Sequence, residues 1–416
     1  MSEKVFFELA LVQIAILVIA SRVLGEVFIR FKLPVIVGEI VAGIILGPAI
    51  LGILYVNPEI KLFIALGIYL LLFLVGFEEV DLKNVARALH PKNVLAALTS
   101  FLVPFIMYCY FLPFYLGEEW AVSVLVASVL ALTSIGVVVR CLTDLNLLNT
   151  VEGANLINIA ILSEVLGLIV ASITLELMLY PDANGYYLLP VKIVAFFVLA
   201  AFIGYHVAPL IIREVENKFK VKEASFAALI TLILLFSAAA VMAGLHGIFG
   251  ALILGFMLSR KRDDFIINRS VQQLKGFAYG IFIPIFFAGI GLYVTLDFLS
   301  LNFLTIVSFA LIILAGKLLG GYLGSRILAL RGKPGVLTMG QLCKGGVELA
   351  ILSLALALEV ITRELYSFIV IMVILLAVLS SISLNILGSY KYEDLNLPER
   401  VDLRLRKSQT YKKRDK

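Results

Sequence analysis

Long apolar runs constrain the fold of this chain more than any other feature. A helix that crosses a bilayer needs about 20 mainly apolar residues, and thirteen candidate runs lie between charged or Pro/Gly-containing breaks. The runs cover residues 5–21, 33–52, 59–77, 93–115, 119–141, 154–178, 187–212, 224–243, 246–259, 277–295, 300–324, 335–358 and 365–388. The pattern predicts an all-α polytopic membrane protein with thirteen transmembrane helices.

The composition supports lipid as the surrounding solvent. Of 416 residues, 62% are hydrophobic and 15% are charged, whereas soluble domains average about 25% charged residues. A soluble globule could not cover its surface with so few polar side chains. The sequence therefore excludes an ordinary soluble enzyme or binding domain.

Lysine and arginine are distributed unevenly among the connecting segments. If the N-terminus lies outside, 28 of the 34 basic residues fall in cytoplasmic connections or in the C-terminal tail. Because cytoplasmic connections carry an excess of basic residues, we expect a protein of the cell (plasma or inner) membrane with its N-terminus outside and its C-terminus in the cytoplasm. Two basic residues, Lys317 and Lys344, lie within apolar runs.

Residues 1–390 are expected to form one transmembrane domain, and residues 391–416 a short basic cytoplasmic tail. The tail is too short and too polar to bury a core, so we expect no attached nucleotide-binding domain and no nucleic-acid partner. Its basic residues can bind anionic lipid headgroups; the alternative is a solvated tail.

Thirteen helices divide into six, one and six. The first repeat covers residues 5–178, the linker helix residues 187–212 and the second repeat residues 224–388. Because one helix separates them, the two repeats have opposite orientation, as in the inverted repeats of many secondary transporters. Such transporters have broken helices at equivalent positions, so we expect runs 119–141 and 335–358 to be broken.

Both runs carry residues suited to a break. In the first, Thr133 and Ser134 can satisfy backbone groups that an interruption leaves unpaired. In the second, Lys344 precedes two glycines, Gly345–Gly346, that permit a break. Glu348 then falls in the first turn of the next helix, where an acid complements the helix dipole. The alternative is an unbroken helix with a Lys344–Glu348 pair one turn apart.

One acidic residue stands in the middle of the sixth run. Glu164 lies roughly 15 Å deep at a rise of 1.5 Å per residue. An ionisable group at the bilayer centre costs at least about 2.5 kcal/mol, and such groups usually face the protein interior and function there. The same estimate places several polar residues near the midplane. The predicted layer comprises Thr133, Ser134, Ser163, Glu164, Lys317, Lys344 and Glu348.

Glu164 is the candidate cation-binding and proton-exchanging residue. Its carboxylate is a hard, charged oxygen ligand, and a proton and a metal ion would compete for it, which is the minimum that an antiporter requires. The candidate ligands for a transported Na⁺ are Glu164, Ser163 and Thr133, with Ser134 beside them. The candidate charge-compensating residues are Lys317, Lys344 and Glu348. The alternative is a structural ion pair between Glu164 and a lysine.

Six segments, in order along the chain, resemble the second cation:proton antiporter family, the group that contains the NapA-type Na⁺/H⁺ antiporters and the Kef-type potassium exchangers. The segments are LPVIVGEIVAGIILGP (33–48), LGIYLLLFLVGFEEVDLKNV (66–85), ALTSIGVVVRCLTDLNLLNTVEG (131–153), GALILGFML (250–258), FIPIFFAGIGLYVTL (282–296) and GKLLGGYL (316–323). The resemblance runs through most of the sequence.

The resemblance implies a homodimer of the NhaA-type fold, in which a core bundle moves like an elevator. It places Glu164 at the position of the essential cation-binding acid, with Ser163 beside it. It matches Lys317 to the lysine that pairs with this acid in electrogenic members. With Glu164 as the only proton carrier, exchange of one H⁺ for one cation is electroneutral; release of a proton from Lys317 would make it electrogenic.

We expect a secondary active antiporter that exchanges cytoplasmic Na⁺ or Li⁺ for external H⁺. The nearest alternative is K⁺/H⁺ exchange of the Kef type, followed by a cation channel and by a Na⁺-coupled organic-anion symporter on the same fold. An enzyme is not expected, because the chain lacks HExxH and Walker sequences. No cofactor is expected besides the transported Na⁺ or K⁺ and H⁺.

The three cysteines, Cys109, Cys141 and Cys343, are far apart in the sequence and lack metal-ligand spacing. Their odd number argues against a disulfide framework. We expect them to be small buried apolar side chains.

Overall fold

The structure of the protein is a computed structural model that describes residues 3–78, 89–145, 147–148, 150–179, 189–243, 245, 247–300, 303–328 and 334–393. This described part is built from helices and contains no β-strand. The expected all-α class is confirmed. Apart from residues 391–393, which continue the last helix, the predicted basic tail lies outside the described residues.

Ten helices of the described residues are long and apolar enough to cross a membrane, which makes the chain a multi-pass membrane protein. The predicted number of thirteen is not confirmed, because three of the predicted spans correspond to shorter helices. These are α2 (Val35–Leu46), α12 (Ile248–Leu258) and α17 (Gly346–Ala357), of 12, 11 and 12 residues.

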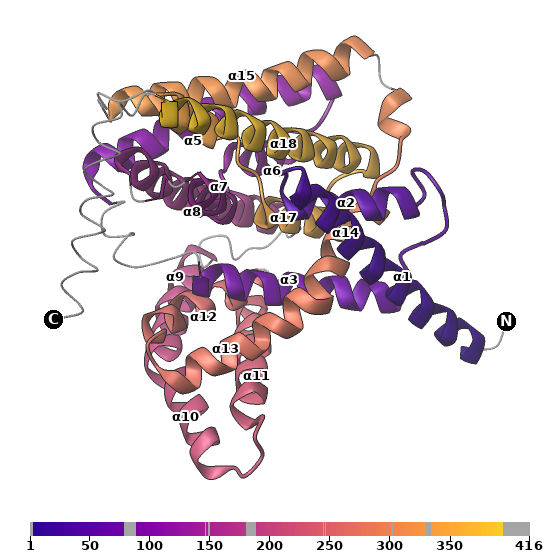
Figure 1. Ribbon diagram of the computed structural model, residues 1–416, viewed down its shortest axis with the longest axis vertical. Helices are drawn as coiled ribbons and strands as arrows, with labels where there is room; N and C mark the ends of the chain where they lie inside the picture. The colour runs from indigo at the N-terminus through magenta and orange to yellow at the C-terminus, as the bar shows by residue number, and fades with distance from the viewer. Residues whose placement is uncertain are drawn as a thin grey trace.

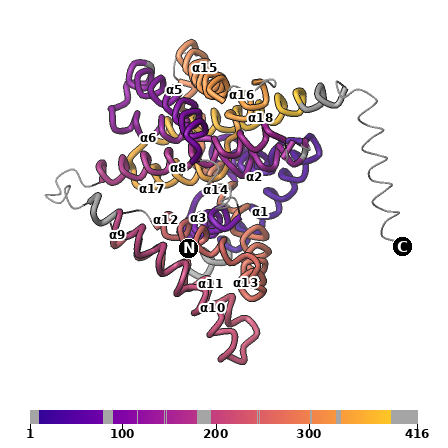
Figure 2. The backbone as a smooth tube through the Cα atoms, turned by 90° about the vertical axis from the view of Figure 1, so that its left-hand side faces the viewer, coloured from indigo at the N-terminus to yellow at the C-terminus, as the bar shows by residue number. Residues whose placement is uncertain are grey.

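The helices pack as two bundles, and Figures 1 and 2 show α9 to α13 at one end of the molecule and α5 and α15 at the other. The first bundle contains α1 (Glu3–Arg30), α2, α3 (Pro58–Glu78), α9 (Leu189–Phe202), α10 (Ala208–Lys218), α11 (Ala224–Met242), α12, α13 (Phe265–Phe277) and α14 (Ile283–Tyr293). The second contains α5 (Pro91–Leu116), α6 (Trp120–Ala131), α7 (Ile135–Asp144), α8 (Val151–Leu179), α15 (Phe303–Ile327), α16 (Gly335–Gly340), α17 and α18 (Arg363–Glu393).

Each bundle takes helices from both predicted repeats, residues 5–178 and 224–388. Neither bundle is therefore a contiguous domain of the sequence. The internal symmetry that would relate the two repeats, and the role of residues 187–212 as a linker helix, stay predictions.

Glycines bring the backbones of the first bundle together. A Cβ atom at Gly43 on α2 would lie 1.8 Å from the carbonyl oxygen of Ala288 on α14. A Cβ atom at Gly255 on α12 would lie 2.1 Å from the carbonyl oxygen of Phe73 on α3. Lipid tails provide no hydrophobic drive for helix association, so close packing of small residues stabilises these contacts.

The two bundles contact each other through a few helices. In the described residues α14 packs against α17 and α18, α3 against α17, and α2 against α18. A Cβ atom at Gly346, the first residue of α17, would lie 2.8 Å from Leu71 on α3 and 3.0 Å from Phe287 on α14. The start of α17 therefore lies directly at the junction of the bundles.

We expect Gly255→Ala to lower the thermal stability of the protein, because its methyl group would overlap the Phe73 carbonyl and overpacking costs about 1–3 kcal/mol. Gly276→Ala is the matched control, since a Cβ atom there meets nothing within 4 Å. Size-exclusion chromatography after stepwise heating measures both variants. Equal melting temperatures for the two variants would contradict the close packing of α3 on α12.

Candidate functional site

The first broken helix consists of α6 and α7. Helix α6 ends at Ala131 and α7 begins at Ile135. Leu132 and Ser134, on either side of Thr133, have extended backbone with φ/ψ of −67°/161° and −73°/122°. The break therefore lies at the residues from which the sequence predicts it.

The second broken helix consists of α16 and α17. Helix α16 ends at Gly340 and α17 begins at Gly346. The observed break begins earlier than the predicted one, and Lys344 lies in the non-helical segment rather than at a helix end. The backbone of Gly345 is extended, with φ/ψ of −144°/−152°, and leads directly into α17.

The two breaks contact each other. The backbone N–H of Ser134 donates to the carbonyl oxygen of Cys343 at 3.1 Å. A Cβ atom at Gly345 would lie 2.3 Å from Oγ of Ser134, so a side chain at position 345 would push the breaks apart. The two broken helices that the sequence predicts are confirmed, and the structure places their breaks against each other.

Glu164 caps the N-terminal end of α7. Its side chain is buried, with 3% of the residue exposed, and Oε2 accepts a hydrogen bond from the backbone N–H of Ile135 at 2.9 Å. A negative charge is stabilised at a helix N-terminus because the first N–H groups have no partner within the helix. Ser134 holds the N-cap position, but its side chain makes no capping hydrogen bond. The expected cap by Ser134 is therefore wrong, because a carboxylate from α8 takes that place.

Two buried lysines bind the C-terminal end of α6. Nζ of Lys317 donates to the carbonyl oxygens of Ala131 (2.7 Å) and Leu132 (3.2 Å) and to the hydroxyl of Thr133 (2.8 Å). Nζ of Lys344 donates to the carbonyl oxygens of Leu132 (2.5 Å), Leu130 (2.8 Å) and Val129 (3.2 Å). The end of a helix carries unpaired carbonyl groups and a partial negative charge, and both ammonium groups compensate it.

The family resemblance matches Lys317 to the lysine that pairs with the acid at position 164 in electrogenic members, and this pairing stays a prediction. In the structure Lys317 binds the end of α6, and Lys344 reaches the same helix end. The physical reason is that the break leaves several carbonyl groups of α6 close together in an apolar interior.

Glu348 caps α17. Its Oε2 accepts from the backbone N–H of Gly345 at 3.0 Å, and its Oε1 lies 3.8 Å from Nζ of Lys344. The Lys344–Glu348 pair, expected only for an unbroken helix, therefore exists together with the break. The charge of Lys344 interacts with the charges of Glu348 and Glu164, so the three groups form one electrostatic unit.

The hydroxyl groups of the predicted site have different partners. Thr133 donates to Oε1 of Gln341 at 2.8 Å and accepts from Lys317, so its oxygen is already engaged. Oγ of Ser163 is fully buried and has no hydrogen-bond partner among the described residues. Of the predicted neutral ligands, Ser163 is therefore the one whose hydroxyl makes no hydrogen bond within the described part of the chain. Gln341, which the sequence analysis overlooks, was detectable as a polar residue within an apolar run.

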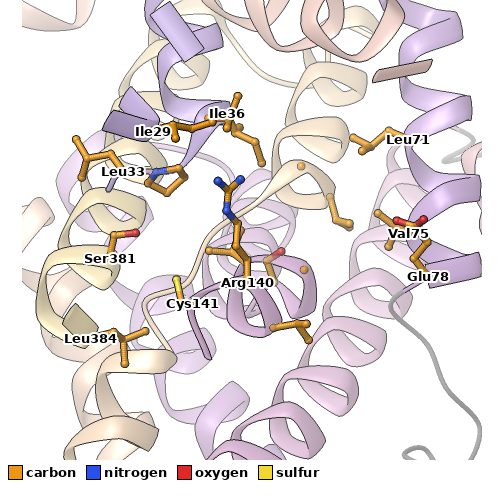
Figure 3. Close-up of a pocket in the computed structure, with 18 of the residues that line it drawn as sticks. Ile29, Leu33, Ile36, Leu71, Val75, Glu78, Arg140, Cys141, Ser381 and Leu384 are labelled. Carbon is orange, nitrogen blue, oxygen red and sulfur yellow. The ribbon is translucent and has the colours of Figure 1, made fainter. Parts of the chain in front are cut away.

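A cavity of about 1250 Å³ lies between the two bundles and reaches the crossing at Ser134 and Gly346. Figure 3 shows side chains from several helices around it, with Arg140 in the middle of the view. The wall from the first bundle includes an ion pair, overlooked in the sequence, between Arg22 and buried Glu39 at 3.5 Å. The wall from the second bundle includes Asn158 on α8, the helix of Glu164.

Arg140 is a further charged residue of the cavity, and its sequence context indicates only the cytoplasmic side of the membrane. Its side chain is exposed to the cavity and makes no ion pair with a described side chain. Five residues of α7, or about 7.5 Å of helix rise, separate it from Ile135, the residue that binds Glu164. The cavity therefore carries a positive charge on the helix that Glu164 caps.

Comparisons with known proteins identify the family. The family of transmembrane sodium/hydrogen exchangers matches residues 14–389. The chain belongs to the sodium/hydrogen exchanger family. This match confirms the expected assignment to the cation:proton antiporters. The narrower expectation, the second cation:proton antiporter family with its Kef-type exchangers, is corrected to the sodium/hydrogen exchanger family.

Relatives of this exchanger align along almost their whole length. The probable Na⁺/H⁺ antiporter GerT of Bacillus cereus is 29% identical over 360 residues, which cover 86% of this chain and 94% of the relative. A Na⁺/H⁺ antiporter of Enterococcus hirae is 26% identical over 382 residues, with 89% and 96% covered. The solved structure of the sodium proton antiporter MjNhaP1 from Methanocaldococcus jannaschii superimposes on this exchanger with a TM-score of 0.68 at 17% sequence identity. The superposition covers 92% of this exchanger and 97% of that chain, and it confirms the antiporter fold.

We expect Arg140→Gln to lower the KM for the transported cation. Removal of a like charge from the cavity lowers the electrostatic cost of bringing a cation to the site, by a few tenths of a kcal/mol in water, so the KM at low ionic strength should fall by about twofold. Arg140→Lys, which keeps the charge, is the matched control. Transport by proteoliposomes at increasing concentrations of an impermeant salt measures the effect, which should vanish as the salt screens the charge. An unchanged KM at low ionic strength would contradict an electrostatic role for Arg140.

Proposed function

We propose that this protein is a secondary active antiporter that exchanges Na⁺ or Li⁺ for H⁺ and that Glu164 holds either the cation or the proton. The observation that carries the proposal is a buried carboxylate at the crossing of two broken helices, bonded to Ile135, the residue next to Ser134 in the cavity wall. Relatives known as Na⁺/H⁺ antiporters support the choice of Na⁺.

The chemistry of the exchange follows from one charge. A proton or a monovalent cation neutralises the Glu164 carboxylate equally, so the two occupants compete. Ser163 can add a neutral oxygen, since its hydroxyl is fully buried with no hydrogen-bond partner among the described residues. Thr133 is a weaker candidate ligand, because Lys317 and Gln341 already engage its hydroxyl.

The two bundles suggest how access alternates between the sides of the membrane. In our proposal the bundle of α5 to α8 and α15 to α18 carries Glu164 and slides against the other bundle as an elevator. The cavity is lined by Arg22, Lys32, Arg140 and Arg262, which the distribution of basic residues assigns to the cytoplasmic side. With the N-terminus outside, the cavity faces the cytoplasm, and the structure corresponds to the inward-facing state.

The contacts of Lys317 favour electroneutral exchange. A cation that binds Glu164 does not have to displace Lys317, because this lysine is held by the end of α6. Lys317 then keeps its proton during the cycle, and one H⁺ moves for each monovalent cation. We propose this stoichiometry in place of the electrogenic alternative that the family resemblance allows.

Exchange of K⁺ for H⁺ is the second candidate function. Two relatives favour it: a Na⁺/H⁺–K⁺ antiporter, GerN, of Bacillus cereus, 26% identical over 364 residues, and a K⁺/H⁺ antiporter of Saccharomyces cerevisiae, 27% identical over 396 residues. The cation channel and the organic-anion symporter stay lesser alternatives. A channel would pass ions without a proton signal, and a symporter would take up an anion with Na⁺.

A homodimer and the binding of anionic lipid by residues 391–416 remain part of the proposal. The homodimer is what the family resemblance implies, and native mass spectrometry from detergent or lipid discs tests both. A monomer without retained lipid across the tested conditions would contradict this part alone.

We expect Glu164→Gln to abolish exchange, because an amide neither carries a proton nor neutralises a cation. Glu176→Gln on the same helix α8 is the matched control and should retain exchange. Solid-supported-membrane electrophysiology combined with a pH-sensitive dye, after jumps of Na⁺, Li⁺ and K⁺, reports the transported ion and the coupled proton. Full exchange by Glu164→Gln would contradict the proposed mechanism. A wild-type response to K⁺ alone would keep Glu164 as the ion site but would replace Na⁺ by K⁺ as the substrate.

We expect Lys317→Met to reduce stability without changing the charge moved per cycle. The substitution removes the donor of three hydrogen bonds at the end of α6, and a buried acceptor left unpaired costs about 1–3 kcal/mol. The melting temperature and the net transported charge are measured on the same preparation. A net current in the wild type that disappears in Lys317→Met would show that Lys317 carries a proton and would overturn electroneutral exchange.

A further inference from the structure

Two of the three cysteines, far apart in sequence, meet at the crossing. Cys141 lies on α7 and lines the cavity, as Figure 3 shows. Cys343 lies in the break between α16 and α17 and is fully buried. The side chain of Cys141 packs against the apolar cluster that contains Cys343, and the thiol of Cys343 interacts with the thiol of Cys141 and the hydroxyl of Ser380. The expectation of small buried side chains is confirmed for Cys109 and Cys343, whereas Cys141 is only partly buried.

The cysteine pair joins the two broken helices next to the candidate ion site. The carbonyl oxygen of Cys343 accepts the N–H of Ser134, and the next residue, Lys344, holds the end of α6. Cys141 lies on the same helix as Ile135, whose N–H binds Glu164. A bond between the two sulfur atoms would thus tie the helix that Glu164 caps to the segment that carries Lys344.

The two thiol groups differ in access. Cys141 faces the cavity, whereas Cys343 lies behind it. A small oxidant in the cavity therefore meets Cys141 first, and Cys343 is placed to react second. This arrangement of an accessible cysteine beside a resolving cysteine is the one found in redox-sensitive sites. Cys109 on α5 lies in a different packed cluster and has no such neighbour among the described cysteines.

We propose that Cys141 and Cys343 form a redox modification site at which a peroxide closes an intramolecular disulfide and thereby slows exchange; the effect on exchange rests on the proposed function. Hydrogen peroxide transfers one oxygen to the Cys141 sulfur, giving a sulfenic acid and one water. The Cys343 sulfur then attacks the sulfenic sulfur, the S–O bond breaks, and the hydroxyl leaves with the thiol proton as a second water. The two thiols lose two electrons in total and the peroxide gains them.

The disulfide acts within the moving bundle, because it fixes the contact between the two broken helices beside Glu164. Binding or release of an ion at Glu164 changes the charge at the start of α7 and the charge that Lys344 interacts with. The two broken helices must adjust to this change, and a covalent link between them opposes the adjustment. Reduction of the disulfide by a dithiol reagent restores the free pair.

The test begins with the bond itself. The full-length protein is treated with hydrogen peroxide and mapped by mass spectrometry of peptides without reduction. We expect a Cys141–Cys343 disulfide and a fall in free thiol groups from three to one per chain. Cys109→Ser is the matched control and should form the same bond, whereas Cys141→Ser and Cys343→Ser should not. Absence of the bond in the wild type and in Cys109→Ser would overturn the site.

Transport is measured on the same samples in proteoliposomes. Peroxide should slow exchange by wild type and by Cys109→Ser about tenfold or more, as expected when a required conformational step is blocked, and dithiothreitol should restore it. Cys141→Ser should stay active in peroxide. A disulfide that forms without a change in exchange would overturn the regulatory effect. Absence of cation/proton exchange before oxidation would overturn the proposed function. The presence or absence of the Cys141–Cys343 disulfide in the peptide map would then by itself support or overturn the redox site.

Discussion

The structure depends on how helix ends are satisfied in the middle of a membrane. Two breaks expose backbone groups where no water is available, and an unpaired polar group there costs several kcal/mol. Lys317 and Lys344 supply donors to the end of α6, while Glu164 and Glu348 accept from the starts of α7 and α17. Each of these four charges thus compensates a helix end at the two breaks.

This arrangement gives Glu164 two tasks. The same carboxylate that holds the first N–H of α7 is the group that we propose to bind a proton or a cation. Because either occupant removes its negative charge, ion binding must also weaken the cap of α7 and change the charge next to Lys344. Coupling between ion occupancy and helix geometry therefore requires no additional device.

The predictable part of the fold is the part that lipid dictates. Apolar length alone predicts a multi-pass helical protein, and the cost of buried charge singles out Glu164, Lys317, Lys344 and Glu348. The breaks were also predictable, because Thr133–Ser134 and Gly345–Gly346 are unsuited to the interior of a helix. The choice of partners was not predictable: Lys317 binds the end of α6, and Ser134 leaves the cap of α7 to a residue 30 positions away.

The sequence by itself therefore determined the solvent of this protein, its helical class, the breaks and the residues whose burial requires compensation, because these follow from local polarity and from the length of apolar runs. Only the tertiary structure decided which helix end each charge compensates, that Arg140 faces a cavity between two bundles, and that Cys141 meets Cys343. The physical reason is that helices distant in the sequence pack closely through glycines such as Gly43 and Gly345, and this packing decides which residues become partners. The spacing of residues along the chain does not predict it.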